Sequence, residues 1–359
     1  MKPISVALLT STQTAASGLY GLLDVLSSVG IVWETAVSGQ PPRALFDVKI
    51  VASEGMPFRC ATGGMIAPDM NLDETAVPDI AIVPGISASS NGATLAGDRA
   101  TLEWLEDRLR RGTRIASACT GALVLAEAGL LDGNEATTHW AYRDLFRRRY
   151  PRVRLRTERN LCIASNGIVT SGGTTAWQQL ALHLIENHCG REHAVRASKF
   201  WLLPDIGDLQ APFAAMTHGS GHEDSAIRRC QAWIADNHSI TSPVEAMIAC
   251  SALPPTTFAR RFRRATGYAP IEYVHEVRVE RARQMLETSD CPVEQIGGMV
   301  GYEDTASFRR LFKRITGLTP RDYRRLFGTT RFARLSGSAP AGRDPAPGAL
   351  DNRQPGSVL

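Results

Sequence analysis

The residue best placed to do chemistry is Cys119, in the stretch IASACTGALVLAEAGLLDG at 115–133. An apolar run typical of a strand ends at this cysteine, and an Ala/Leu-rich segment typical of a helix begins at Thr120. Such a sharp strand-to-helix turn exposes a nucleophile above a sheet, and the amides at the start of the helix would stabilise a thiolate. We interpret Cys119 as a thiol that lines a ligand pocket, with a catalytic nucleophile and inert packing as the alternatives.

Nucleophilic catalysis needs a base beside the thiol and a site for an oxyanion. His139, in ATTHW at 136–140, could be that base, and it suits a structural strand end equally well. The loop VPGISASS at 83–90 follows the carboxyl end of a predicted strand, where ligands bind in open α/β sheets. We assign no catalytic residue. The ligand-pocket candidates from these segments are Cys119, Thr120, His139, Gly85 and Ile86.

Three histidines and a cysteine gather in HLIENHCGREH at 183–193. The histidines are five residues apart, which places them on different faces of a helix rather than on the shared i, i+4 face of a zinc-binding helix. We therefore predict no metal site, and we expect no cofactor.

A repeat in the last third of the chain carries the second candidate site. FARRFRRATGYAPIEY at 258–273 recurs as FRRLFKRITGLTPRDY at 308–323, an offset of fifty residues. Upstream of each copy, a similar motif places proline in the first turn of a predicted helix: SPVE at 242–245 and CPVE at 291–294. In the first copy the serine and glutamate of SPVE predict a capping box. Each copy has the layout of a helix-turn-helix, whose second helix enters the DNA major groove.

The segment between the two copies predicts a helical spacer over 271–286. At about 1.5 Å per residue the spacer is roughly 24 Å long, which holds the two units near the roughly 34 Å of one DNA turn. Both second helices could then face one side of a duplex. The residues expected on the apolar stripe of the spacer are Ile271, Val274, Ala282, Met285 and Leu286.

The block IGGMVGYEDTASFRRLFKRITGLTPRDYRR at 296–325 strongly resembles the signature of AraC/XylS-type transcription regulators. The resemblance covers about 225–328. It implies base-reading positions at Thr256, Ala259 and Arg260 in the first unit and at Thr305, Ala306, Arg309 and Arg310 in the second. The basic residues on the later turns, where phosphate contacts are expected, are Arg263, Arg264, Lys313 and Arg314.

The chain departs from the AraC/XylS pattern at two places. Pro254 and Pro255 stand where that family commonly begins the first recognition helix with Ser-Pro-Arg, so this helix offers fewer long donors. Gly297 replaces the usual alanine, which should loosen the supporting helix of the second unit by about 0.5–1 kcal/mol. We expect the second unit to carry more of the base readout.

The stretch SACTGALVLAEAGLLDGNEATTHW at 117–140 resembles the class I glutamine amidotransferase-like superfamily, which includes PfpI-type proteases and isocyanide hydratases. The resemblance covers residue 4 to about 212. PfpI-type enzymes have histidine after the cysteine, where this chain has Thr120. Isocyanide hydratases have threonine there and use an acidic residue near the first helix, a position that we assign to Gly18, with Asp24 too far along. Fused to an AraC-type module, the domain is similar to GlxA-like regulators, which implies a small, nitrogenous effector.

The N-terminal two-thirds alternates β-branched runs with helical segments near 18–29, 98–111 and 120–129, which is typical of a parallel sheet covered by helices. We predict an α/β sandwich with a mostly parallel, flavodoxin-like sheet, followed by an all-α domain of two helix-turn-helix units. The net charge is −3 over 1–224 and +5 over 225–328, so the basic character lies in the helical part. The predicted divisions are a sensor domain at 1–213, an exposed linker without apolar anchors at 214–224, a DNA-binding domain at 225–328 and a disordered tail at 329–359.

The seven cysteines are scattered and contain no CxxC, which fits reduced thiols in a cytoplasm. No apolar run approaches the roughly 20 residues that span a bilayer, so we expect no membrane contact. The leading hypothesis is a transcription regulator that is not an enzyme, with promoter DNA, a small effector and a second copy of the chain as partners, and RNA polymerase as a further candidate. The alternative is a cysteine-dependent hydratase or amidohydrolase fused to a DNA-binding module.

Overall fold

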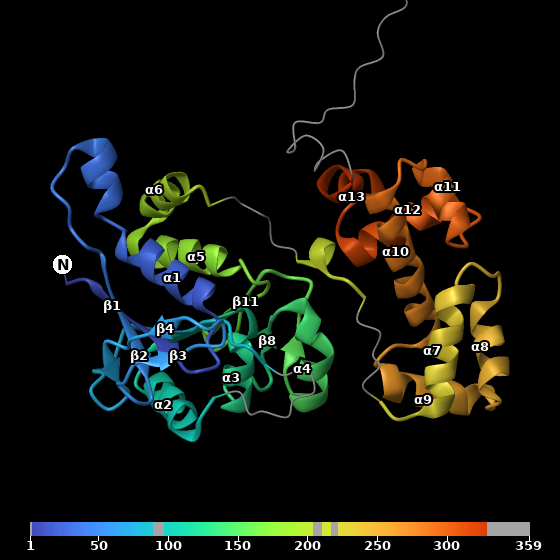
Figure 1. Cartoon of the computed structure of the whole chain (residues 1–359), viewed down its shortest axis with the longest axis horizontal. Helices are drawn as coiled ribbons and strands as arrows, with labels where there is room; N and C mark the ends of the chain where they lie inside the picture. The colour runs from blue at the N-terminus through green and yellow to red at the C-terminus, as the bar shows by residue number, and fades with distance from the viewer. Residues whose placement is uncertain (1, 89–96, 204–209, 217–221, 329–359) are drawn as a thin grey trace, which may run out of the picture.

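The computed structural model describes residues 2–88, 97–203, 210–216 and 222–328. The predicted tail at 329–359 and residues 217–221 of the predicted linker lie outside the described residues. Figure 1 shows an α/β unit on the left and an all-helical unit on the right. Within the described ranges, no helix combines the length and the apolar composition that a membrane crossing requires.

Seven strands form one sheet in the order β10-β11-β7-β6-β1-β2-β5. Neighbouring strands are parallel except β10 and β11, which form an antiparallel pair. The strands are β1 (Ile4–Thr10), β2 (Phe46–Ala52), β5 (Met70–Asn71), β6 (Ile80–Val83), β7 (Arg114–Ala118), β10 (Leu161–Ile163) and β11 (Val169–Ser171). The central order β2-β1-β6-β7-β11 is the flavodoxin-like order, so the predicted fold class of this unit is confirmed. Two small sheets pair β3 (Phe58–Arg59) with β4 (Met65–Ile66) and β8 (Glu135–Ala136) with β9 (Arg154–Leu155).

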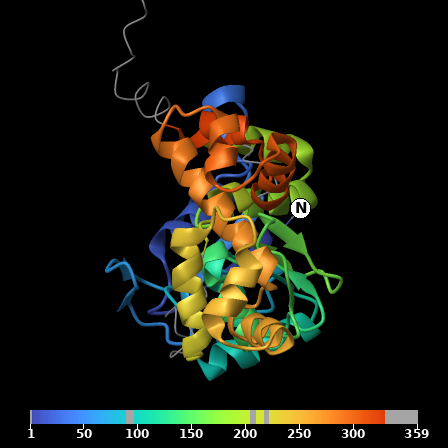
Figure 2. The same ribbon diagram turned by 90° about the vertical axis from the view of Figure 1, so that its right-hand side faces the viewer.

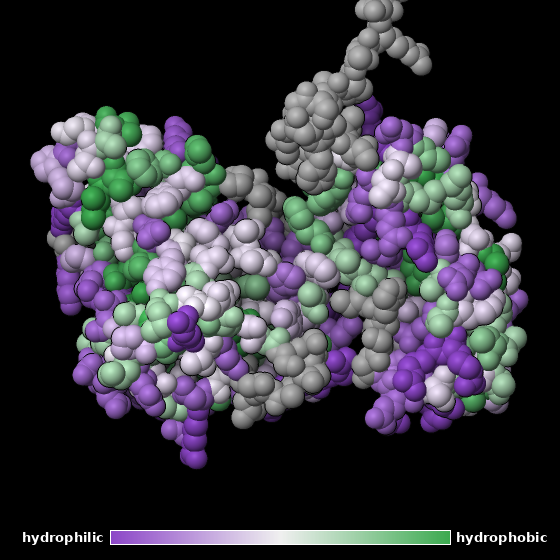
Figure 3. All heavy atoms as spheres, viewed as in Figure 1, coloured by the Kyte–Doolittle hydropathy of each residue, from purple (hydrophilic) through white to green (hydrophobic). Residues whose placement is uncertain are grey.

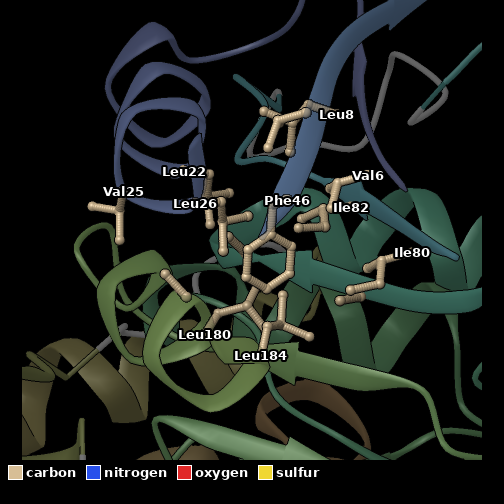
Figure 4. Close-up of a cluster of buried hydrophobic side chains, with 14 of the residues drawn as sticks. Val6, Leu8, Leu22, Val25, Leu26, Phe46, Ile80, Ile82, Leu180 and Leu184 are labelled. Atoms are coloured by element: carbon tan, nitrogen blue, oxygen red, sulfur yellow. The ribbon is translucent and has the colours of Figure 1, made fainter. Parts of the chain in front are cut away.

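Helices cover both faces of the sheet. The helices on one face are α1 (Ala16–Ser27), α5 (Trp177–Cys189) and α6 (Arg191–Trp201). Those on the other face are α2 (Arg99–Arg110), α3 (Ala122–Glu127) and α4 (Arg143–Arg149). Because side chains alternate along a strand, Val6 and Leu8 of β1 pack against α1 and α5 (Figure 4), whereas Ala7 and Leu9 pack toward the opposite helices. The predicted helices of this unit are confirmed to within a turn at their ends.

The helices of the helical unit are α7 (Ser225–Asn237), α8 (Pro243–Ser251), α9 (Pro255–Thr266), α10 (Pro270–Thr288), α11 (Val293–Met299), α12 (Thr305–Thr316) and α13 (Pro320–Phe327). They comprise two recognition helices, α9 and α12, their supporting helices α8 and α11, the spacer α10, and two further helices, α7 and α13. Figure 2, in which this unit faces the viewer, shows α10 running through its length. At about 1.5 Å per residue the 19 residues of α10 span roughly 28 Å.

The fifty-residue repeat folds into two matching aromatic cores, one on each half of α10. The Phe262 and Tyr273 rings pack edge to face with centroids 5.3 Å apart, and Phe312 and Tyr323 do the same at 5.4 Å. All four side chains are buried. Each recognition helix is therefore fixed by its own core, and α10 supplies residues to both.

Three local predictions are wrong. The Ser242 side chain makes no capping bond at the start of α8, because its backbone (φ −115°, ψ 64°) is not the extended one that an N-cap favours. Ile271 is 45 % exposed, since the buried face at the start of α10 runs through Pro270 and Tyr273 and leaves Ile271 beside it. The predicted linker does hold an apolar anchor, because Met216 is buried in the first aromatic core.

Candidate functional site

Cys119 lies on a strained turn between β7 and α3. β7 ends at Ala118, and residues Cys119–Gly121 form a single 3-10 turn, η2, that leads into the helix. The φ of Cys119 is +55°, a left-handed backbone that a residue with a Cβ rarely adopts. A Cβ at Gly121 would lie 2.3 Å from the carbonyl oxygen of Val83, so only glycine allows the turn to approach β6 this closely. The thiol is thereby presented at the carboxyl edge of the sheet.

Hydrogen bonds join the turn to the loop that follows β6. The Thr120 hydroxyl accepts a hydrogen bond from the Ile86 amide at 2.8 Å and donates one to the Ile86 carbonyl at 2.5 Å. A Cβ at Gly85 would lie 3.4 Å from the Cβ of Cys119. The structure therefore brings Gly85 and Ile86 against Cys119 and Thr120. Residues 89–90 of the predicted loop lie outside the described residues.

A pocket of about 320 Å³ opens above this turn, at the small end of the volumes of small-molecule sites. It contains all five of the ligand-pocket candidates, including His139. Sequence reasoning missed two aromatic side chains of the pocket, Tyr142, three residues after His139, and Trp177, from a distant segment. The other described residues in its wall are Ala15, Ser17, Gly18, Ala118 and Thr174.

The described part of this wall contains no carboxylate. Gly18, to which we assigned the position of the hydratase acid, lines the pocket, and a Cβ added there would make ordinary contact with Trp177 Cδ1 at 3.8 Å. Asp24 is exposed further along α1 and is not among the residues that line the pocket. The ionisable side chains that line the pocket are Cys119, His139 and Tyr142.

The recognition helices turn a basic face to solvent. Their apolar residues are buried in the two aromatic cores, whereas the predicted DNA contacts lie on the opposite face. Figure 3 shows hydrophilic surface gathered at the lower right of the helical unit, where α9 lies. Thr305 is partly buried. The exposed members of the predicted set are Thr256, Ala259, Arg260, Arg263, Arg264, Ala306, Arg309, Arg310, Lys313 and Arg314.

The two recognition helices begin differently. Asp304 caps α12 and accepts hydrogen bonds from the Ala306 and Ser307 amides, both at 2.9 Å. The N-cap of α9 is Pro254, whose side chain makes no capping bond. The first turn of α12 therefore has the more firmly set backbone.

Two arginines of α12 have partners within the domain. Arg309 forms an ion pair with Glu294 of α11, and Arg310 donates a hydrogen bond to the Ser307 hydroxyl at 2.8 Å. These side chains are more than half exposed, and exposed pairs of this kind contribute little to stability. Both guanidinium groups can therefore exchange these partners for a nucleic acid at small cost.

Comparison with known proteins agrees with this geometry in both units. The model described as "DJ-1/PfpI family" matches residues 5–187, more than half of the chain. This chain belongs to the DJ-1/PfpI family. A second model, described as "Helix-turn-helix domain", matches residues 248–326, which include α9 to α12. The two resemblances seen in the sequence, to a PfpI-like domain and to an AraC-type helix-turn-helix domain, are thus confirmed.

Three relatives illustrate the range of similar proteins. The HTH-type transcriptional regulator GbdR of Pseudomonas aeruginosa is 26% identical over 79% of this chain and 76% of its own length. The HTH-type transcriptional regulator GlxA of Rhizobium meliloti is 26% identical over 78% of this chain and 83% of its own. An isonitrile hydratase of Pseudomonas putida is 29% identical over 53% of this chain and 75% of its own. The two regulators thus match more than three quarters of this chain, and the hydratase matches about half of it.

The thiol of the DJ-1/PfpI domain is not activated. Burial raises the pKa of Cys119, and this effect outweighs the hydrogen bonds from Thr120 and Thr174 that favour the thiolate. The amide at the start of the helix does favour the thiolate, as expected, but the loss of water around the sulfur is the larger influence and raises the pKa of Cys119. At neutral pH Cys119 is a thiol, which is a poor nucleophile.

His139 is oriented as a hydrogen-bond donor. Its Nδ1 accepts the Ala141 amide at 3.1 Å, which leaves the proton on Nε2 in the neutral ring. Burial lowers the pKa of His139, so the ring is neutral at pH 7. In this state the free ring nitrogen gives a proton to a hydrogen bond and has no lone pair to offer as a base.

The described residues contain no group of three or more His, Cys, Asp and Glu side chains placed to hold a metal ion. His183, one of the three clustered histidines, is hydrogen-bonded to Asn187 at 2.9 Å instead.

Proposed function

We propose that this protein is a cytoplasmic transcription regulator that binds promoter DNA through residues 225–328 and senses a small molecule in the DJ-1/PfpI domain at 1–213. The observation that carries the proposal is the pair of recognition helices, α9 and α12, each with an exposed basic face and its own aromatic core on one spacer helix. A single helix-turn-helix is a common structural element, whereas two joined by a spacer helix roughly 28 Å long could reach sites about one duplex turn apart. The named regulators, which match more than three quarters of this chain, support the same function.

In this proposal the second unit reads bases and the later turns of both helices bind phosphates. Arg310 lies on the first two turns of α12, which is capped by Asp304, and arginine there can pair with a guanine edge. Arg263 and Arg264 on α9, and Lys313 and Arg314 on α12, lie in the last turns and neutralise backbone phosphates. Arg260 and Arg309 are the remaining base-reading candidates with long side chains.

The effector that fits the pocket is small and nitrogenous. Tyr142 and Trp177 offer aromatic faces that attract a cationic nitrogen, and the described wall holds no carboxylate that would pair with it as a salt bridge. His139 donates from Nε2, so a carboxylate or carbonyl oxygen on the same ligand would be its partner. An amino acid or betaine-like compound has both features. A homodimer formed through the DJ-1/PfpI domain would present two DNA-binding units, and RNA polymerase is a further proposed contact.

The second candidate function is a hydratase or amidohydrolase, which the isonitrile hydratase relative favours. The pocket argues against it on three grounds. Burial raises the pKa of Cys119, His139 presents a donor rather than a base, and Gly18 stands where the hydratases carry an acid. We therefore propose that the domain binds a ligand without converting it.

The proposal is tested in two steps with the full chain. A duplex is first selected from a random-sequence library, and its affinity is compared with that of unselected DNA; the expected preference is at least about a thousandfold. Amino acids and betaines are then screened by thermal shift, and a compound that stabilises the wild type but not Cys119→Ser identifies the pocket ligand. Failure to enrich any sequence would contradict the regulator function, and turnover of a stabilising compound would establish the enzyme instead.

A further inference from the structure

One buried amide joins the wall of the pocket to the segment that leads into the helical unit. Gln210 is 2 % exposed. Its Nε2 donates to the Thr138 carbonyl at 2.8 Å and to the Thr137 hydroxyl at 3.1 Å, and its Oε1 accepts the Trp140 amide at 3.2 Å. The Nε2 group also donates to the Arg159 carbonyl at 3.2 Å, so the side chain is bonded at both ends to residues 137–140 and at one end to Arg159. Buried amides bonded at both ends are expensive to displace, because any movement leaves polar atoms unpaired.

The segment held by Gln210 is also part of the effector pocket. The Thr138 hydroxyl donates to the Cys119 carbonyl at 3.0 Å, and His139 lines the pocket directly. A ligand that contacts His139 or displaces the turn at Cys119 therefore acts on the backbone groups that Gln210 binds. A shift of the backbone at residues 137–140 would therefore alter the hydrogen bonds of Gln210.

On its other side Gln210 leads into the helical unit. It precedes the short helix η4 (Ala211–Phe213), and the Ala211 carbonyl accepts a hydrogen bond from Arg283 of α10 at 3.1 Å. Arg283 is 5 % exposed and also donates to the Ala214 carbonyl. Its guanidinium lies 5.9 Å from the ring centroid of Tyr323, the residue that packs edge to face on Phe312 of α12.

These contacts form one continuous series from the backbone carbonyl of Cys119 to the second recognition helix. We propose that Gln210 and Arg283 are positioning residues that couple effector binding to DNA binding. The inference rests on the proposed function. A ligand that shifts residues 137–140 moves Gln210 and η4, and Arg283 passes that shift to the spacer helix and to the aromatic core beneath α12. The series supplies the physical connection, and the energetic coupling is what the experiment measures.

The test uses the full chain, a duplex that this chain selects from a random library, and iodoacetamide at pH 9 as the probe that occupies the pocket at Cys119. Cys119→Ser treated in parallel corrects for alkylation of the other thiols. The dissociation constant of the DNA is measured before and after alkylation in the wild type, in Gln210→Met and in Arg283→Met. Gln210→Met keeps the length of the side chain and removes its hydrogen bonds. Gln40→Met, at an exposed glutamine, is the matched control.

We expect alkylation to change the DNA affinity of the wild type and of Gln40→Met about fivefold or more. In Gln210→Met and Arg283→Met the change should fall below twofold, while unmodified Gln210→Met binds DNA as the wild type does. Hydrogen exchange of η4 and α10 should respond to alkylation in the wild type and not in Gln210→Met. This readout needs no DNA.

The possible failures are distinguishable. A wild type that selects no sequence contradicts the proposed function, and the coupling falls with it. DNA binding that is unaffected by alkylation, or affected equally in Gln210→Met and the wild type, overturns the coupling alone. An exchange response that persists in Gln210→Met also overturns it.

Discussion

Replacing Arg310 by alanine should remove sequence recognition and leave the fold unchanged. The Arg310 side chain is 73 % exposed on α12, and its contacts within the protein are the hydrogen bond to Ser307 and a 3.8 Å approach to the exposed Asp304 carboxylate. Alanine is a better helix former than arginine. The structure therefore predicts no loss of thermal stability.

The expected loss of binding is that of one bidentate contact to a guanine edge, about 1–3 kcal/mol, which corresponds to roughly 5-fold to 150-fold in affinity. This loss should appear on the selected duplex and not on unselected DNA, because a base contact distinguishes sequences and a phosphate contact does not. Arg314→Ala, in the last turn of the same helix, should weaken both duplexes alike and lower the slope of log affinity against log salt by about 1.

Fluorescence anisotropy at several salt concentrations measures both effects. Arg99→Ala is the matched control, because Arg99 is an exposed, ion-paired arginine on α2 of the DJ-1/PfpI domain. The assignment of Arg310 is refuted if its alanine variant keeps the affinity for the selected duplex, or if both duplexes lose affinity equally.

Three further predictions concern stability and the pocket. Phe308→Ala removes a fully buried ring under α12 and should lower the free energy of unfolding of the helical unit by about 3–5 kcal/mol, seen by calorimetry as an early transition; an unchanged transition would contradict the aromatic core. Because burial raises the pKa of Cys119, its alkylation rate should still be rising with pH at pH 9, and a plateau near pH 7 would reveal an activated thiolate. Because burial lowers the pKa of His139, the unfolded state binds the proton first, so thermal stability should fall from pH 7 to pH 5 and fall less in His139→Gln; an equal fall in both would exclude this contribution.

The repeat and the sheet are the parts of the fold that the sequence predicts best. Phe262 and Phe312 recur at a fixed offset because each unit needs the same aromatic core, and such a requirement is visible without coordinates. The β-branched runs mark the strands for a similar reason, since both faces of the sheet are buried. The predictions fail at the ends of helices and strands. At Ser242, for example, the backbone conformation decides whether the side chain caps α8.

The pocket was predictable only in part. Cys119, Thr120 and the loop around Gly85 follow from the rule that ligands bind at the carboxyl ends of parallel strands. Trp177 reaches the pocket from a helix whose placement depends on tertiary packing, so no spacing in the chain marks it, whereas Tyr142 lies three residues after the candidate His139. The sequence indicated the helix amide that favours the thiolate of Cys119, but not the burial that raises its pKa, because burial is a property of the folded chain.

The role of Gln210 was still harder to predict from the sequence than the pocket residues. It stands in a segment without hydrophobic periodicity, and its contacts to residues 137–140 join positions about seventy residues apart. A polar residue in such a segment is usually solvated. The burial of Gln210 is therefore visible only in the folded structure. Met216 was misread as part of an exposed linker for the same reason.

The spacing of the two half-sites tests the central claim most directly. If α10 holds α9 and α12 against one side of a duplex, the selected sequence should contain two recognition elements centred about one helical turn, roughly 10 base pairs, apart. Inserting five base pairs between them turns one element to the far side of the duplex and should lower the affinity of the full chain at least tenfold, about 1.4 kcal/mol, whereas inserting ten should restore the facing. Affinity that is unchanged by the five-base-pair insertion would contradict the account, because the two units would then not read DNA together.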